Sequence, residues 1–241
     1  MSKMIPLENI LSRVRVAPEV FELRPDYRAL LMVVDGIPPG PCDTTSEALL
    51  QEAEASARRQ LTQHAVIDMP HVAAWRDAYK AFGAKPQRTR NSLEALTRRV
   101  EGGLPRVNRL TDIYNAISVK HQIPLGGEDL NKYEGAPRLI RATGKENFET
   151  VTSGDIVVEH PDTGEVVWCD DVGVTSRRWN WRQGPRTALT DSTTRALFIL
   201  DALSPVSDSS LHAAAEELTS TLKELSPDVR VERRIISIST R

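Results

Sequence analysis

The segment 28–34 constrains the fold more than any other part of this chain, because it is a continuous apolar run. Its sequence is RALLMVV, and a Pro-Pro-Gly-Pro breaker follows at residues 38–41. A strand with one solvent face alternates apolar and polar residues, whereas a strand buried on both faces is apolar throughout. The sequence therefore predicts a buried strand at 28–34.

Periodicity and turn residues predict the remaining elements. Helical spacing and caps indicate helices at 44–63, 71–82, 91–100, 108–121, 190–203 and 211–225. Short apolar runs indicate strands at 13–16, 20–23 and 229–238, and a hairpin that joins 156–159 to 166–169. No repeat or long linker interrupts them. We therefore expect one α+β domain over 1–241, with mixed or antiparallel sheets and packed helices.

Composition narrows the class of protein. The 241 residues are 40% hydrophobic and 27% charged, as in an ordinary globular protein. No apolar run approaches the roughly 20 residues that cross a bilayer, and the N-terminal segment lacks the apolar core of a secretory signal. Two cysteines, Cys42 and Cys169, are too few for a disulfide framework. We expect a cytoplasmic protein without a membrane contact.

The motifs of several familiar enzymes are missing from the sequence. It has no Gly-x4-Gly-Lys-Ser/Thr loop, no Gly-x-Gly-x-x-Gly after a strand, no paired His or Cys at metal-ligand spacing, and no Gly-x-Ser-x-Gly elbow. ATP hydrolysis, dinucleotide redox chemistry and zinc catalysis are therefore not expected. We expect no cofactor and no metal.

Basic residues are concentrated although the formal net charge is −2. Residues 76–109 hold nine basic and three acidic residues, and residues 173–190 hold four arginines and no acid. A basic face suits a phosphate backbone, although solvated helix faces explain single charge runs equally well. The second stretch contains SRRWNWR at 176–182, whose tryptophans and arginines are suited to stacking on bases and holding phosphates. In a strand, Trp179 and Trp181 would share one face as core anchors, and Arg178, Asn180 and Arg182 the other.

The segment 108–129 holds the other candidate site residues. Its helix has an apolar stripe, and Asn115 falls on the opposite, polar side, either solvated or directed into a cleft to orient a water or a carbonyl. Gly126 and Gly127 follow Pro124 and are predicted to form a turn, with bare N–H groups near a ligand and with Glu128 and Asp129 beside them. Asp170 and Asp171 are either turn residues or carboxylates for an α-ammonium group.

Several motifs in order resemble the free-standing B3/B4-domain proteins, relatives of the editing module of the phenylalanyl-tRNA synthetase β subunit. They are FG at 82–83, SLEALTRR at 92–99, LPRVN at 104–108, DIYNAIS at 112–118, PLGGED at 124–129 and RRWNWR at 177–182. The resemblance spans about residues 74–203. It implies an α+β domain with a pocket for the aminoacyl end of tRNA. In the synthetase, the module hydrolyses tyrosine wrongly attached to the phenylalanine tRNA.

The chain departs from the family pattern at two pocket positions. The family has a Thr-Asn pair eleven residues ahead of the histidine of a Pro-Leu-His-Ala-Phe-Asp segment. Asn115 and Asp129 match this pattern, whereas Tyr114 replaces the threonine and Gly126 replaces the histidine. Both departures bear on tyrosine specificity, and the second removes a water-positioning group. An aminoacyl ester is already activated, so positioning a water and stabilising an oxyanion can still suffice.

The resemblance thus implies a trans-acting aminoacyl-tRNA deacylase that clears a mischarged tRNA. The alternatives are a non-catalytic module that binds tRNA or an amino acid, and a partner of a synthetase. The expected catalytic groups are Asn115, Gly126 and Gly127. The expected substrate-binding residues are Tyr114, Glu128, Asp129, Asp170, Asp171, Arg178, Asn180 and Arg182. The expected tRNA-binding residues are Arg88, Arg90, Arg98, Arg99, Arg106 and Arg177.

Overall fold

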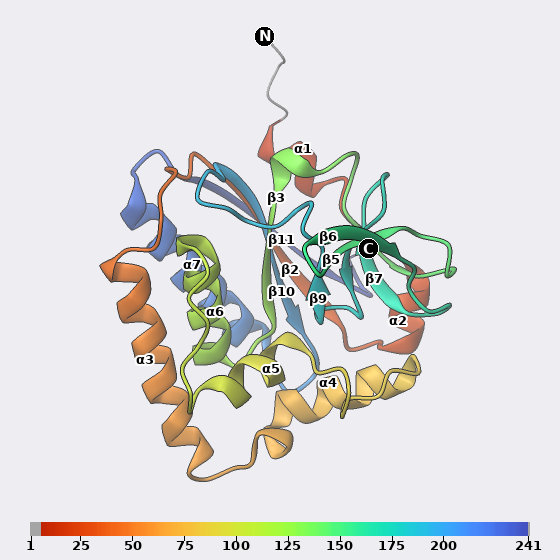
Figure 1. Ribbon diagram of the computed structural model, residues 1–241, viewed down its shortest axis with the longest axis horizontal. Coiled ribbons are helices and arrows are strands. Elements are labelled where there is room, and N and C mark those ends of the chain that lie inside the picture. The colour runs from red at the N-terminus through yellow and green to blue at the C-terminus, as the bar shows by residue number, and fades with distance from the viewer. Residues whose placement is uncertain (1–5, 241) are drawn as a thin grey trace.

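The computed structural model describes residues 6–240, so residues 1–5 and 241 of the domain expected over 1–241 lie outside the described residues. The fold is α+β, as predicted, with an antiparallel sheet at its centre, a mixed sheet beside it and a two-stranded arm (Figure 1). The extent of a single domain over the whole chain stays a prediction.

The central sheet has the strand order β11-β2-β10-β3, and all neighbours are antiparallel. Its strands are β2 (Arg28–Asp35), β3 (Leu125–Asp129), β10 (Arg195–Ala202) and β11 (Arg230–Ser237). Side chains of β2 alternate between two hydrophobic clusters. Leu30, Met32 and Val34 join one, and Leu31 and Val33 join the other. The continuous apolar run therefore reflects burial on both faces, as predicted.

Helices cover one face of the central sheet, and three other helices together with the second sheet cover the opposite face. The covering helices are α6 (Arg109–His121) and α7 (Asp208–Leu225), and α3 (Thr44–Leu61) packs outside α6 (Figure 1). The opposite face packs against α1 (Leu7–Leu11), α2 (Pro18–Leu23) and α4 (Pro70–Ala81).

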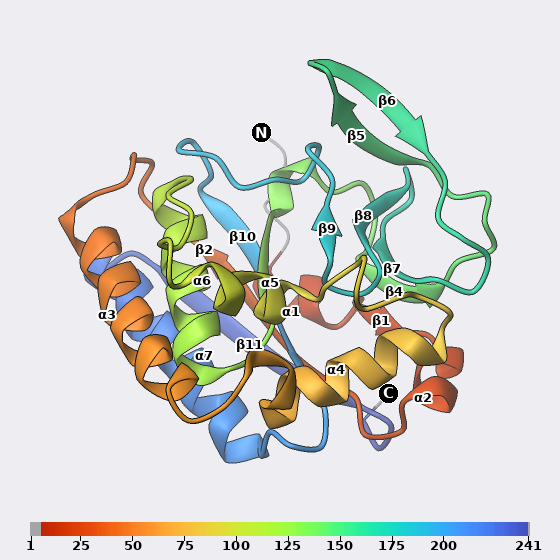
Figure 2. The same cartoon turned by 60° about the horizontal axis from the view of Figure 1, so that its bottom comes forward.

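The second sheet has the order β1-β4-β7-β8-β9. Its strands are β1 (Arg15–Val16), β4 (Arg138–Arg141), β7 (Val166–Cys169), β8 (Val174–Arg177) and β9 (Arg182–Gln183). The arm is formed by β5 (Phe148–Thr152) and β6 (Asp155–Glu159), and it projects from the body next to this sheet (Figure 2).

Helix caps explain where two of the predicted helices begin. The α3 helix begins at Thr44, as predicted, after an Asp43 cap whose Oδ1 accepts a 2.8 Å bond from the Ser46 N–H. The helix α5 (Ser92–Arg99) has the predicted Asn91 cap, which accepts from the Glu94 N–H at 2.9 Å. No helix in residues 6–240 is long and apolar enough to cross a membrane.

Two element predictions are wrong because tertiary context overrides local pattern. Residues 20–23 belong to helix α2, whose first residue is Pro18, a position that suits proline because its missing N–H would have no partner there. Residues 195–202, predicted as part of a helix, form strand β10 between β2 and β3. A segment that is buried on all sides is apolar throughout, so its sequence has no periodicity that distinguishes a helix from a strand.

Two turn predictions are also wrong. Residues 125–129 are not a turn but the edge strand β3, with Gly126 and Gly127 opposite Ile199 and Phe198. Residues 156–159 and 166–169 do not pair with each other, because β6 pairs with β5 and β7 pairs with β4 and β8. The short element η1 (Val66–Asp68) precedes α4, and η2 (Leu130–Lys132) continues β3.

Candidate functional site

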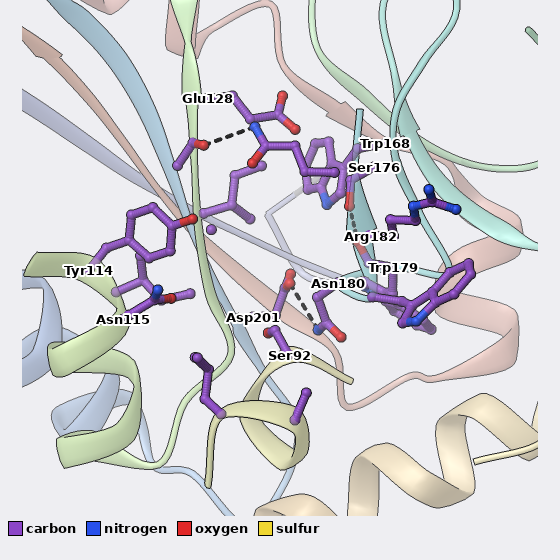
Figure 3. Close-up of a pocket in the computed structure, with 18 of the residues that line it drawn as sticks. Ser92, Tyr114, Asn115, Glu128, Trp168, Ser176, Trp179, Asn180, Arg182 and Asp201 are labelled. Atoms are coloured by element: carbon purple, nitrogen blue, oxygen red, sulfur yellow. Dashed lines mark hydrogen bonds between the residues drawn. The ribbon is translucent and has the colours of Figure 1, made fainter. Parts of the chain in front are cut away.

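A pocket with a cavity volume of about 300 Å³ opens between the central sheet, α5, α6 and the second sheet (Figure 3). Segments far apart in the sequence form its walls: α5, α6, β3, β7, β8 with β9, and β10. The pocket is lined by Ser92, Ala95, Leu96, Arg99, Tyr114, Asn115, Leu125, Gly126, Gly127, Glu128, Trp168, Ser176, Trp179, Asn180, Trp181, Arg182, Gln183, Ile199 and Asp201. The two sequence segments singled out by motif therefore meet here.

Strand β3 presents Gly126 and Glu128 to the pocket. A Cβ at Gly127 would lie 2.7 Å from Leu189 and 2.8 Å from Phe198, so that side of the strand faces the core. A Cβ at Gly126 would meet nothing within 4 Å, so its side is open space. Because side chains alternate along a strand, Glu128 shares the open side with Gly126. The two glycines thus have different roles: one leaves room in the pocket, and the other allows close packing.

In strand β3, alternate backbone N–H groups point toward β10 and toward the outer edge of the sheet. The Asp129 N–H donates to Thr187 O at 2.8 Å, and Gly127 O accepts from Gln183 Nε2 at 3.0 Å, so both groups lie on the outer edge of the strand. N–H directions alternate along an antiparallel strand, which puts the Gly127 N–H on this outer edge and the Gly126 N–H toward β10. Of the two glycines, Gly127 therefore has its N–H on the outer edge of β3, away from β10.

Helix α6 lies next to β3 and contributes Tyr114 and Asn115 to the same side of the pocket (Figure 3). Asn115 is 7% exposed, which excludes the solvated alternative, and its side chain lines the pocket. Asp112, three residues earlier in the same helix, is also buried and accepts from the Val107 N–H at 2.8 Å. The polar side of α6 is therefore largely internal.

Residues 178–181 form the turn between β8 and β9, not a strand with two faces. Arg178 and Trp179 have φ values of 47° and 67°, in the left-handed region. Trp179 is fully buried, with its ring centroid 5.3 Å from that of Trp75. Trp181 instead lies against arginine, with the Arg178 guanidinium 4.5 Å from its ring centroid. The prediction that both tryptophans share a face is wrong because the turn reverses the direction of the side chains.

The floor of the pocket contains Asp201, a residue that sequence reasoning missed. Its Oδ1 accepts a 2.6 Å bond from the Tyr27 hydroxyl, and its Oδ2 accepts from Asn180 Nδ2 at 3.1 Å (Figure 3). Burial raises the pKa of Asp201 to about 7 against the opposing effect of these two bonds. The available signal was one acid inside the apolar run ALFILDAL, since a buried carboxyl is rare without a specific partner.

Glu128 is the second carboxyl that lines the pocket. It is 4% exposed, and its Oε2 accepts a hydrogen bond from the Tyr133 hydroxyl. Burial raises the pKa of Glu128 to about 8, opposed by a hydrogen bond from Thr175. Two buried carboxyls with raised pKa values in one cavity are typical of a functional site.

The other predicted carboxylates lie outside the pocket. Asp129 accepts from the Thr193 hydroxyl at 2.8 Å and from the Asn131 N–H at 2.9 Å. Asp170 binds both terminal nitrogens of Arg186 at 2.8 Å, and Asp171 binds Arg138 at 2.6 Å. All three therefore hold loops in place, and none lines the cavity.

The predicted arginines differ in where they lie: some line the pocket, some are exposed on the surface, and others are directed into the protein. Arg99 and Arg182 line the pocket, and Arg88, Arg90, Arg98, Arg99 and Arg106 are exposed. Arg177, by contrast, is 6% exposed, and its guanidinium is held inside the protein by Glu165 at 2.8 Å and Glu159 at 3.0 Å. Arg178 is also directed away from the cavity, to Thr89 at 2.8 Å and Glu165 at 3.6 Å.

Exposed arginines differ in their partners. Arg106 pairs with Glu47 at 2.7 Å and with Glu54 at 2.6 Å, and Arg98 pairs with Glu94 at 3.0 Å. Arg99 makes no side-chain hydrogen bond or ion pair with any part of the chain that the structure describes. Arg182 donates to the Thr150 hydroxyl of the arm. Within residues 6–240, no three His, Cys, Asp or Glu side chains are grouped to hold a metal ion.

A protein-family model and several solved structures match this chain. Among solved structures, the chain is similar to an N-terminal fragment of the phenylalanyl-tRNA synthetase β-subunit from Pyrococcus horikoshii, with 10% identity and a TM-score of 0.49. The match covers 90% of this chain and 49% of that fragment, so the chain spans about half of the fragment's length. No curated protein matches the chain. The family model described as the B3/4 domain matches residues 74–227, more than half of the chain. The chain therefore belongs to the B3/4 domain family, as its motifs predicted.

Proposed function

We propose that this chain is a trans-acting aminoacyl-tRNA deacylase, an ester hydrolase that clears a mischarged tRNA. The observation that carries the proposal is one cavity lined by Asn115, Gly127, Asn180 and Arg182, which come from three separate segments. Membership in the B3/4 domain family supports it. A cavity of about 300 Å³ is at the lower end of the range for small-ligand pockets and suits an aminoacyl group.

The proposed hydrolysis requires no nucleophilic side chain and no strong base, because an aminoacyl ester is activated and the neighbouring ribose hydroxyl can assist the attack of water. In this proposal, the Asn115 amide orients the water or the ester carbonyl, and the Gly127 N–H faces the developing oxyanion. Preorganised donors of this kind are worth roughly 3–4 kcal/mol of barrier each. The side chain of the amino acid occupies the floor beside Asn180 and Asp201.

Cationic groups at the pocket support an anionic substrate. Arg99 and Arg182 line the cavity, and we propose that they contact the terminal phosphates of tRNA. We propose that four exposed arginines also contact the phosphates of tRNA. They are Arg88, Arg90, Arg98 and Arg106. The proposed partner is thus the aminoacylated acceptor end of tRNA, in the cytoplasm, with a synthetase as a further partner.

The test is to incubate the protein with a broad panel of mischarged and correctly charged tRNAs and to follow the release of the amino acid. We expect hydrolysis of at least one mischarged species at a rate well above that of spontaneous deacylation. Absence of hydrolysis across the panel would reject the enzyme. One observation favours the alternative of a non-catalytic binding module: Gly126 leaves open space where the family resemblance puts a histidine. Salt-dependent binding of tRNA without hydrolysis would support that alternative.

A further inference from the structure

The pocket contains a buried carboxyl whose role the proposed reaction does not assign. Among the described carboxyl groups, Glu128 and Asp201 line the cavity. The aspartates that the sequence predicted to bind substrate, Asp129, Asp170 and Asp171, are engaged elsewhere. A carboxylate that binds the substrate must therefore be one of these two.

Both carboxyls accept hydrogen bonds from two protein groups, and Glu128 also lies beside open space. Both oxygens of Asp201 have donors, from Tyr27 at 2.6 Å and from Asn180 at 3.1 Å. Glu128 accepts from the Tyr133 hydroxyl on Oε2 and from the Thr175 hydroxyl, and a carboxylate has about four lone-pair sites, so it can accept from a further donor. Glu128 also shares the open side of β3 with Gly126, where a Cβ would meet nothing within 4 Å. A ligand group therefore has room beside Glu128.

The charges around Glu128 leave it without a dominant cation. Tyr133 and Thr175 face it with hydroxyl groups, and Tyr114 faces it from α6. Asp170 acts on it as a like charge and Arg186 as an opposite one, but the Arg186 guanidinium is already bound by Asp170 at 2.8 Å. With burial as the largest effect, the pKa of Glu128 is raised to about 8, so its carboxyl is mostly neutral at pH 7. A ligand cation that enters the pocket would ionise it.

We propose that Glu128 binds the free α-ammonium group of the aminoacyl ligand and makes the pocket selective for an unblocked amino acid. The inference rests on the proposed function, since it names the substrate class of the same site. An N-acylated aminoacyl group has no cation to pair with Glu128 and adds bulk beside it, so N-blocked and peptidyl esters are rejected.

Binding then releases a proton from Glu128. At pH 6 the carboxyl is protonated and must lose its proton to pair with the ligand, so affinity for the ammonium form rises with pH. The rise approaches tenfold between pH 6 and 7, below the usual pKa of an α-amino group near 7.7–8.0. A ligand without an amine shows no such rise.

The experiment measures binding without chemistry. The probes are 3′-aminoacylamino-3′-deoxyadenosines, in which an amide replaces the ester, carrying glycine, serine, phenylalanine or tyrosine. Each is used with a free and with an acetylated amino group. In calorimetry at pH 7, we expect the free amine to bind at least tenfold more tightly than its acetylated form, with proton release in buffers of different ionisation enthalpy. In Glu128→Gln, we expect the preference to fall below about threefold and the proton release to disappear.

Asp171→Asn is the matched control, because Asp171 is an exposed carboxylate outside the pocket and should leave the preference intact. Thermal unfolding of Glu128→Gln checks that the variant is folded. Equal binding of both probe forms, binding of neither, or an unchanged preference in Glu128→Gln would overturn the inference.

Two experimental outcomes distinguish a failure of the proposed deacylase activity from a failure of the proposed role of Glu128. Hydrolysis of N-acetyl-aminoacyl-tRNA as fast as of its free-amine form would leave the deacylase standing and reject the role of Glu128. A Glu128-dependent preference for the free amine, with no hydrolysis on the tRNA panel, would support the role of Glu128 and reject the deacylase.

Discussion

Asn180 donates a hydrogen bond of 3.1 Å from its Nδ2 to Oδ2 of Asp201, and this bond ties the turn at 178–181 to the central sheet. The Tyr79 hydroxyl donates to Asn180 Oδ1 at 3.0 Å, so the orientation of the amide is set from both ends. The Tyr27 hydroxyl completes the network at Asp201 Oδ1. A polar group in the floor of the pocket is thus positioned by two core tyrosines.

Replacing Asp201 with alanine should destabilise the protein, because the fully buried Tyr27 hydroxyl loses its acceptor and Asn180 loses one of its partners. We expect the free energy of unfolding to fall by about 2–4 kcal/mol, as measured by urea denaturation. Tyr27→Phe removes the hydroxyl together with its need for an acceptor and should cost less. An Asp201→Ala variant as stable as the wild type would show that the network contributes little.

Asn115→Ala should remove hydrolysis while leaving tRNA binding intact, since its amide is assigned to the reacting ester and not to the phosphates. We expect a loss of about 10²–10³-fold in kcat, the usual effect of removing one oriented donor. Single-turnover deacylation and a filter-binding assay measure the two properties. Parallel loss of binding and hydrolysis would contradict the catalytic role.

Gly126 and Gly127 should respond differently to the same substitution. Gly127→Ala puts a Cβ within 3 Å of Leu189 and Phe198, and we expect a loss of stability of about 1–3 kcal/mol. Gly126→Ala adds a methyl group to open space, and we expect a change of less than about 1 kcal/mol. Thermal unfolding of the two variants side by side makes the comparison. Similar losses of stability in both variants would contradict the assignment of Gly126 to open space and Gly127 to the core.

Arg99→Gln should weaken tRNA binding more than Arg106→Gln. Arg99 lines the pocket and has no ion pair within the described chain, whereas Arg106 is already neutralised by Glu47 and Glu54. We expect Arg99→Gln to lower the slope of log affinity against log salt by about 1. For Arg106→Gln the slope should stay near that of the wild type. Titrations of labelled tRNA from 50 to 200 mM salt, roughly the usual working range, provide both slopes.

His71 should make the protein less stable in mild acid. Its Nε2 accepts from Trp75 Nε1 at 3.0 Å and from the Leu203 N–H at 3.1 Å, which requires a neutral ring. Burial lowers the pKa of His71 to about 4, below its unfolded value near 6.5. The unfolded state thus binds more protons between these values, and stability falls as pH drops from 6.5 to 4. By linkage, the loss at pH 5 is about 2 kcal/mol.

A His71→Asn variant isolates this contribution, because the buried carboxyls Glu128 and Asp201 have raised pKa values and act in the opposite direction. Urea denaturation of both proteins at pH 7 and pH 5 gives the difference. If the wild type loses no more stability on acidification than the variant does, His71 is not the group responsible.

Sequence patterns identified the family, the buried strand β2 and the helices that carry caps, because these features are local. They failed where burial is complete on all sides, as in β10, since an apolar run such as ALFILDAL is compatible with either a strand or a helix. The motifs at 114–115 and 177–182 did converge on one pocket. Asp201 was missed because its role depends on Tyr27, 174 residues earlier in the chain.

The turn at 178–181 puts a fully buried tryptophan next to the asparagine of the pocket floor. Trp179 cannot leave its place beside Trp75 and Tyr27 without carrying Asn180 with it. Engineering the specificity of this pocket by changing residues 178–181 would therefore also change the fold's melting behaviour. A freer position for redesign is Gly126 on β3, where a new Cβ would meet nothing within 4 Å.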